Sequence, residues 1–87
     1  MTIEFAKSLA GHDKNHYYLI LKKEERFAYL TDGSSHTIER PKKKNHMHYQ
    51  IVKQIPEHIL AQIKENESLT DEKVRCLVKA YERSINK

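Results

Sequence analysis

The sequence contains very little cysteine, glycine, proline or tryptophan. Cys76 is the only cysteine, so neither an intramolecular disulfide nor a zinc site built from several cysteines can form. The chain has two glycines, two prolines and no tryptophan, and it shows neither an internal repeat nor a low-complexity linker. Its longest uncharged apolar run, residues 17–21, is far shorter than a membrane span.

The N-terminal region also lacks the apolar core of a secretory signal peptide, because acidic residues and lysines occur within its first fourteen positions. We therefore expect a reduced, cytoplasmic protein with no membrane partner. A length of 87 residues suits one domain with a small appendage. Hydrophobic residues make up 38% of the chain and occur in clusters, which argues against wholesale disorder.

Positive charge is concentrated in the first part of the chain. Residues 1–53 hold ten Lys and Arg against six Asp and Glu, whereas residues 54–87 hold six of each. Five of the six histidines also lie before residue 54. This asymmetry indicates a polyanionic partner for the first part, although a solubilising basic surface would give the same net charge.

The first part reads as a series of short β-strands. Apolar and polar residues alternate, β-forming residues are frequent, and Asp32-Gly33 is a strong hairpin signal. Strands are expected at residues 3–9, 16–23, 26–31, 35–40 and 48–52, with Pro41 ending the fourth. So few short strands cannot form a large sandwich, so we expect a small, strongly bent barrel.

The second part, residues 54–87, has a helical period. Pro56 suits the first turn of a helix over residues 57–65, which would present Ile59, Leu60 and Ile63 on one side. Thr70 is a good N-cap for a second helix. The apolar stripe of that helix is Val74, Leu77, Val78, Tyr81 and Ile85. The pattern predicts a helical hairpin packed on the barrel, on itself or on a second protein.

The loop after the first strand carries a candidate binding motif. Gly11 and Asn15 both tolerate positive φ and bracket a short polar segment. We expect a tight loop that displays His12, Asp13 and Lys14, although a simple hairpin connection would look the same.

Residues 40–49, RPKKKNHMHY, form the second candidate. Pro41 disfavours a helical conformation at Arg40, so the run should be extended, with Lys42 and Lys44 on one side and Lys43 on the other. Ammonium groups spaced about 6.5–7 Å apart along an extended chain would suit phosphates. His46, His48 and Tyr49 would add contacts to bases or ribose. The alternatives are a solvated loop and, because the run lies between strand patterns, much less favourably a nuclear localisation tag.

Metal binding and catalysis have weaker support. His46 and His48 could share an ion with the distant His36, but neighbouring lysines would repel it and the chain has no cysteine cluster. No candidate nucleophile lies in a strand-to-helix elbow. Cys76 lies within the second predicted helix, on or beside its apolar stripe, and is expected to be a buried, inert thiol. We expect no enzyme activity, cofactor or metal.

The motif SLAGHDKNHYYLIL, followed by DG and RPKKKNHMH, resembles the KOW motif. More closely, it is similar to short bacterial KOW-domain RNA-binding proteins that resemble an archaeal and eukaryotic large-subunit ribosomal protein. The similarity covers roughly residues 5–52, with Ser8, Ala10, Gly11, Asp13 and Lys14 in the KOW loop. Asn15 replaces the motif's usual glycine, and the glycine that usually opens the first strand is missing. The resemblance implies an SH3-like barrel over residues 1–53, followed by the helical extension over residues 54–87.

The resemblance also implies a non-catalytic RNA-binding protein of the translation apparatus, with ribosomal RNA or the ribosome as partner. The candidate RNA-contacting residues are Lys7, His12, Lys14, Arg40, Lys42, Lys43, Lys44, His46, His48 and Tyr49. The alternative is a protein-interaction module that uses the barrel or the C-terminal helix, including a weak homodimer through that helix. Fold alone does not choose between these functions.

Overall fold

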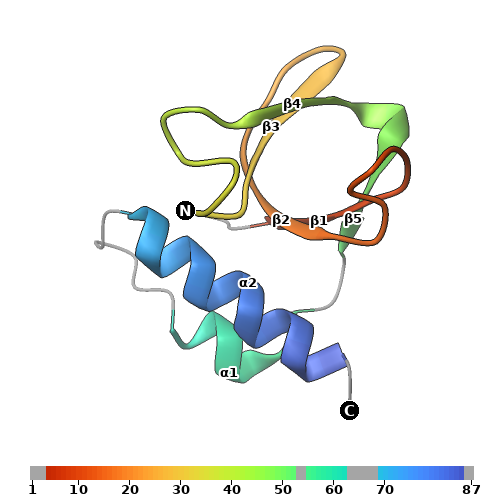
Figure 1. Cartoon of the computed structure of the whole chain (residues 1–87). Helices are drawn as coiled ribbons and strands as arrows, with labels where there is room; N and C mark the ends of the chain where they lie inside the picture. The colour runs from red at the N-terminus through yellow and green to blue at the C-terminus, as the bar shows by residue number, and fades with distance from the viewer. Residues whose placement is uncertain (1–3, 53–54, 63–68, 86–87) are drawn as a thin grey trace.

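A computed structural model describes residues 4–52, 55–62 and 69–85. Its elements are β1 (Glu4–Ser8), β2 (Tyr17–Lys23), β3 (Phe27–Thr31), β4 (Lys42–Asn45), a 3₁₀-helix η1 (His46–His48), β5 (Tyr49–Val52), α1 (Glu57–Leu60) and α2 (Asp71–Ile85). The strands form one antiparallel sheet in the order β4-β3-β2-β1-β5, and the sheet curls on itself (Figure 1). Four of the five expected strands and a barrel-like arrangement are therefore present.

The curled sheet buries side chains on both of its faces. Because successive side chains of a strand point to opposite faces, Phe5 and Leu19 face the helices, while Ala6 and Tyr18 face the interior of the curl. The interior cluster is Ala6, Tyr18, Ala28, Leu30 and Tyr49. The helix-side cluster is Phe5, Leu19, Ile59, Val74, Leu77, Val78 and Tyr81. The helix-side cluster thus joins residues from both sides of the boundary expected near residue 54.

Helix α2 follows the sequence prediction closely. Thr70 accepts a hydrogen bond from the backbone N–H of Lys73 at its Oγ1 (3.1 Å), as an N-cap should. Four of the five stripe residues are buried against the sheet, and Ile85 is exposed. The prediction of a buried thiol was wrong: Cys76 is exposed, because it lies off the stripe. Among the residues described, no helix is both long and apolar enough to cross a membrane.

The first predicted helix is shorter than expected. Helix α1 covers Glu57–Leu60 with Pro56 at its N-cap position, and residues 61–62 form a turn. Ile59 is fully buried in the helix-side cluster, as its place on the predicted apolar side required. Ile63 and the rest of the expected helix lie outside the described residues.

The strand predicted at residues 35–40 was wrong. The segment is irregular, although the expected turn at Asp32-Gly33 is present and Gly33 has φ +74°. A distant contact holds this segment, because the N–H of Ile38 donates to Asp71 Oδ1 of α2 at 2.8 Å. The fourth strand is the lysine run itself, Lys42–Asn45, so Pro41 precedes a strand rather than ending one.

Gly33 lies where the β3–β4 loop meets the N-terminal turn of α2. A Cβ at this position would lie 2.2 Å from the carbonyl oxygen of Asp71 and 2.9 Å from the backbone nitrogen of Arg75. Arg75 Nη1 also donates to the carbonyl oxygen of Gly33 at 2.7 Å. The helix therefore fixes the loop that leads into the lysine-bearing strand.

Candidate functional site

The loop between β1 and β2, residues 9–16, is a tight turn held by its own backbone. Ser8 N–H donates to the carbonyl of His16 (2.9 Å), and Asn15 N–H donates to the carbonyl of Ser8 (2.8 Å). Gly11 and Asn15 have φ of +86° and +73°, as the sequence predicted. The loop is therefore a defined structure and not a loose connection.

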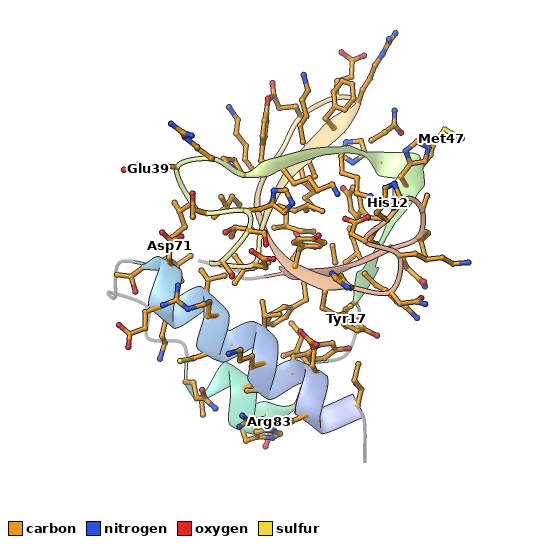
Figure 2. All side chains as sticks on the ribbon, in the orientation of Figure 1. His12, Tyr17, Glu39, Met47, Asp71 and Arg83 are labelled. Atoms are coloured by element: carbon orange, nitrogen blue, oxygen red, sulfur yellow. The ribbon has the colours of Figure 1, made fainter. Side chains whose placement is uncertain are left out.

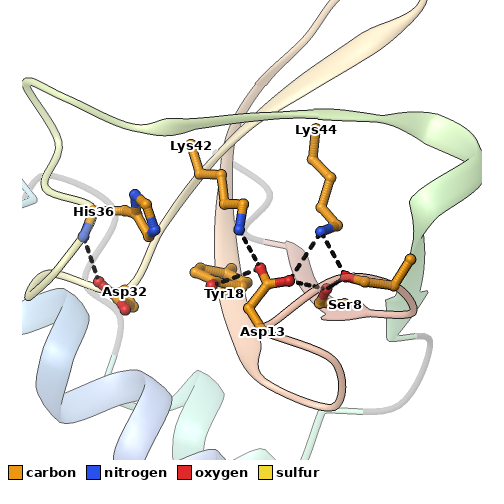
Figure 3. A network of polar contacts seen from close by, with 8 residues as sticks. Ser8, Asp13, Tyr18, Asp32, His36, Lys42 and Lys44 are labelled. Atoms are coloured by element: carbon orange, nitrogen blue, oxygen red, sulfur yellow. Dashed lines mark hydrogen bonds and ion pairs between the residues drawn. The ribbon is translucent and has the colours of Figure 1, made fainter.

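Asp13 anchors this loop from the inside. Its Oδ1 accepts hydrogen bonds from Ser8 Oγ (2.8 Å) and Lys44 Nζ (3.1 Å), and its Oδ2 accepts from Tyr18 Oη (2.9 Å) and Lys42 Nζ (2.7 Å) (Figure 3). The prediction that the loop displays Asp13 was wrong: the residue is 8% exposed. Its carboxylate reaches β4 across the curl of the sheet, which links the loop to an edge strand.

Burial alone would raise the pKa of the Asp13 carboxyl, but its hydrogen bonds oppose this effect. Donors from Lys42, Ser8, Lys44 and Tyr18 outweigh the desolvation and hold the pKa of Asp13 well below its usual range. The same contact affects the partner phenol, since burial and the neighbouring Asp13 carboxylate raise the pKa of Tyr18. Asp13 is therefore a permanent anion at neutral pH, paired with two ammonium groups.

The three lysines of β4 have two different environments. As predicted from strand alternation, Lys42 and Lys44 share one face and Lys43 occupies the other. Lys44 is 7% exposed, and its ammonium also donates to the carbonyl of Ala10 (3.2 Å). The side chain of Lys42 is 29% exposed. Only Lys43 points outward in full, with Nζ 4.3 Å from the centre of the Phe27 ring.

The aromatic and imidazole residues that follow β4 also divide between interior and surface. Tyr49 is 6% exposed and belongs to the interior cluster. His46 contacts the Tyr49 hydroxyl through Nδ1, and its Nε2 lies 2.6 Å from the carbonyl oxygen of Glu24. His48 is exposed. Among the described residues, no three His, Cys, Asp or Glu side chains are grouped as metal ligands would be.

The structure brings several candidates together at one end of the curled sheet. The N–H of Leu9 donates to the carbonyl of His48 (2.9 Å), so the loop at residues 9–16 and η1 are neighbours. Figure 2 shows His12 and Met47 at this end of the molecule. We name this region the loop surface; its exposed residues are Leu9, Gly11, His12, Lys14, Asn15, His16, Met47 and His48. Sequence reasoning did not select His16 and Met47 as candidates, although both lie within the quoted motifs.

Two other candidates lie apart from the loop surface. Lys7 is a partly buried residue of β1, opposite Tyr17 and Gln50 in the neighbouring strands. Arg40 is exposed in the irregular segment before β4, where its N–H donates to Thr37 Oγ1 (3.1 Å). The ten residues predicted to contact RNA therefore do not form one continuous surface.

Sequence reasoning also missed an outer face of the sheet on β2, β3 and β4. There Tyr29 stands opposite both Lys22 and Lys43, and Phe27 lies two residues earlier on β3. The outward alternation of Phe27 and Tyr29 was predictable, and it is observed. Their combination with lysines depends on strand register, which joins residues that are distant in the sequence.

Comparison of the chain with models of protein families gave no match, and comparison with curated proteins gave none either. The polar and aromatic groups of the loop surface include an ammonium group and three imidazoles, beside a thioether, an amide and the aliphatic side chain of Leu9. The only carboxylate within residues 9–16, that of Asp13, is turned away from it.

Proposed function

We propose that the chain is a non-catalytic RNA-binding module of the translation apparatus, with a KOW-type loop on an SH3-like barrel. The observation that carries the proposal is the inward Asp13 carboxylate. It fixes the loop and is neutralised by lysines, so the outward side chains of residues 9–16 bring no negative charge. Such a surface attracts phosphates without a competing acid.

The curl of the sheet supports the SH3-like part of this proposal. The sheet is short-stranded and curled, and β1 pairs with both β2 and β5. Gly11 and Asn15 hold the loop in the left-handed conformations that a tight KOW-like turn requires. Ribosomal RNA is the expected target, because the resemblance of residues 5–52 is to ribosome-associated proteins.

The structure revises which residues would contact RNA. Lys14, His12 and His48 are exposed and suitable for phosphate or ribose contacts, and Arg40 and Lys43 are exposed on other parts of the surface. Lys44 and Tyr49 are engaged in the interior, so we assign them to the stability of the site instead. Lys42 can both stabilise the site and contact RNA, since it pairs with Asp13 and part of its side chain remains exposed to solvent.

The proposal is tested with a blunt RNA duplex of about one helical turn in a fluorescence polarisation titration. Lys14→Gln should weaken binding and reduce the slope of log affinity against log salt by about 0.9, the value for one lost duplex phosphate contact. Lys79→Gln, an exposed lysine of α2, is the matched control and should leave both unchanged. Absence of RNA binding by the wild-type chain would contradict the proposal.

Protein binding is a second candidate, favoured by one observation. An apolar recess of about 500 Å³ is lined by Val52, Ile55, Pro56, Tyr81 and Ile85 at the end of α2. The rest of the α2 stripe is buried within the chain, so Ile85 is the stripe residue that a partner or second copy could reach. Light scattering of wild type and Ile85→Asp checks this candidate: a dimer lost in the variant supports it, and a monomer in both contradicts a dimer.

A further inference from the structure

The outer face of β3 leaves two aromatic rings partly exposed. Ala28 and Leu30 point into the curl and are fully buried, whereas Phe27 and Tyr29 point outward and are only partly covered. In Figure 1 the helices lie below β1 and β2, while β3 and β4 curl away from them. Among the described residues, the buried cluster beneath the helices takes its strand residues from β1 and β2.

Two lysines flank these rings. Tyr29 has Lys22 as its partner on β2 and Lys43 as its partner on β4. The register between β2 and β3 shifts between Ile20 and Lys22. This irregularity puts Lys22, and not Leu21, opposite Tyr29. The ammonium of Lys43 lies over the Phe27 ring. We name this region the outer β3 face; its residues are Lys22, Phe27, Tyr29 and Lys43.

A carboxylate borders the outer β3 face. Glu24 is exposed in the β2–β3 turn, and the neighbouring Tyr29 hydroxyl lowers the pKa of its carboxyl; burial opposes this shift, and the charges of Lys22 and Lys43 add to it. Glu24 therefore offsets part of the positive charge of Lys22 and Lys43 near the Tyr29 hydroxyl.

We propose that the outer β3 face binds single-stranded RNA, with unpaired bases stacked on Phe27 and Tyr29 and phosphates held by Lys22 and Lys43. This inference rests on the proposed function and adds the class of RNA. Rings two residues apart on a strand stand about 6.5–7 Å apart, which suits two successive bases of an extended strand. Stacking requires exposed base faces, and the interior base pairs of a duplex have none to offer.

The ligand competes with the existing contact of Lys43. In the free protein the ammonium covers the Phe27 ring, and a stacked base would take its place while the ammonium moves to a phosphate. Lysine suits this change of contact because its flexible side chain lets the ammonium group reach either the Phe27 ring or an RNA phosphate. Binding should therefore depend on the ring at residue 29 and on the charge at residue 43 separately.

The test compares a short labelled oligouridylate with the blunt RNA duplex by fluorescence polarisation. Tyr29→Leu should weaken oligouridylate binding about five-fold or more and leave duplex binding unchanged. Tyr29→Phe keeps the ring, loses only the hydroxyl, and should bind oligouridylate like wild type. Lys43→Gln, a surface change that spares the core, should reduce the oligouridylate salt slope by about 0.7.

The outcomes separate this inference from the proposed function. Oligouridylate binding that is unchanged in both Tyr29→Leu and Lys43→Gln overturns the outer β3 face, even when the duplex still binds through the loop surface. Binding of neither RNA by the wild-type chain overturns both proposals. Selective loss of oligouridylate binding in Tyr29→Leu, with Tyr29→Phe intact, supports the inference.

Discussion

The helix-side face of β1 and β2 and the interior of the curled sheet are both buried, but against chemically different partners. On the helix side, Phe5 stacks on Tyr81 with ring centres 5.2 Å apart, and aliphatic residues of α2 fill the surroundings. Inside the curl, the apolar cluster is continued by an ion-paired group around Asp13. Apolar packing tolerates changes of pH, whereas buried ion pairs depend on the protonation of their members.

The two clusters differ because different elements cover the two faces of the curled sheet. The helix-side face packs against large apolar residues from α1 and α2, whereas the interior of the curl is closed by residues of the strands and of the loop after β1. Lys42 and Lys44 reach across from β4 and supply both length and hydrogen-bond donors. Among the described residues, every buried side-chain nitrogen and oxygen has a hydrogen-bond partner, so the polar group is complete.

The largest effect is expected from Asp13→Ala. It leaves the buried Lys44 ammonium without its carboxylate, and breaking such a pair from one side costs about 3–5 kcal/mol. Urea denaturation measures the free energy of unfolding. Glu25→Gln, an exposed acid, is the matched control and should change it by less than about 0.5 kcal/mol. Equal stability of Asp13→Ala and wild type would show that the network does not hold the loop.

Leu77→Ala should produce a loss of similar size from the other core. The side chain is fully buried beneath α2, and truncation of such a leucine costs about 2–5 kcal/mol, depending on how far the cavity collapses. The two variants should differ in pH response, because Leu77→Ala removes no ionisable group. Parallel stability–pH curves for Leu77→Ala and wild type, measured by urea denaturation, check this point.

The pH dependence of stability should come in part from Asp13. Its folded pKa lies below that of the unfolded chain, so its contribution is complete above about pH 4 and is lost as the pH falls toward the folded pKa. The loss should be on the order of 2 kcal/mol. Asp13→Asn should flatten the acid limb of the curve, and an unchanged acid limb would assign the effect to other carboxyls.

The smallest effect is expected from Lys23→Gln. The Lys23–Glu4 pair has an Nζ–Oε1 distance of 2.8 Å, similar to those of the Asp13 pairs, but both side chains are substantially exposed. Exposed pairs contribute about 0–1 kcal/mol, and salt screens them. A thermal melt at low and high salt measures the difference. A loss of stability as large as that of Asp13→Ala would contradict the difference expected between this exposed ion pair and the buried Asp13 pairs.

Local patterns were sufficient to predict several elements. Alternation in β3 places Ala28 and Leu30 inside, and the stripe and cap of α2 follow from residue spacing and Thr70. The turn residues Gly11 and Asn15 were also predictable, since few other residues accept positive φ. In each case the determining interactions lie within a few positions of the residue concerned.

Distant contacts explain the failures. The segment at residues 35–40 has strand-forming composition, but Ile38 joins the helix-side cluster and bonds to Asp71 of α2 instead of pairing with a strand. Lys44 was predicted to contact phosphate from an extended run, but it is buried against Asp13, which belongs to a remote loop. Strand alternation indicated that Lys42 and Lys44 share a face, but not which face is interior.

The cover that α2 provides for the sheet has a consequence for biosynthesis. Phe5 and Leu19 are made early, yet the residues that shield them belong to a helix that begins at Asp71. During translation their apolar side chains therefore stay accessible to water and to chaperones until α2 has emerged. The Asp13 network needs only residues up to Lys44. The nascent chain can therefore form this network before α2 covers the apolar helix-side face of β1 and β2.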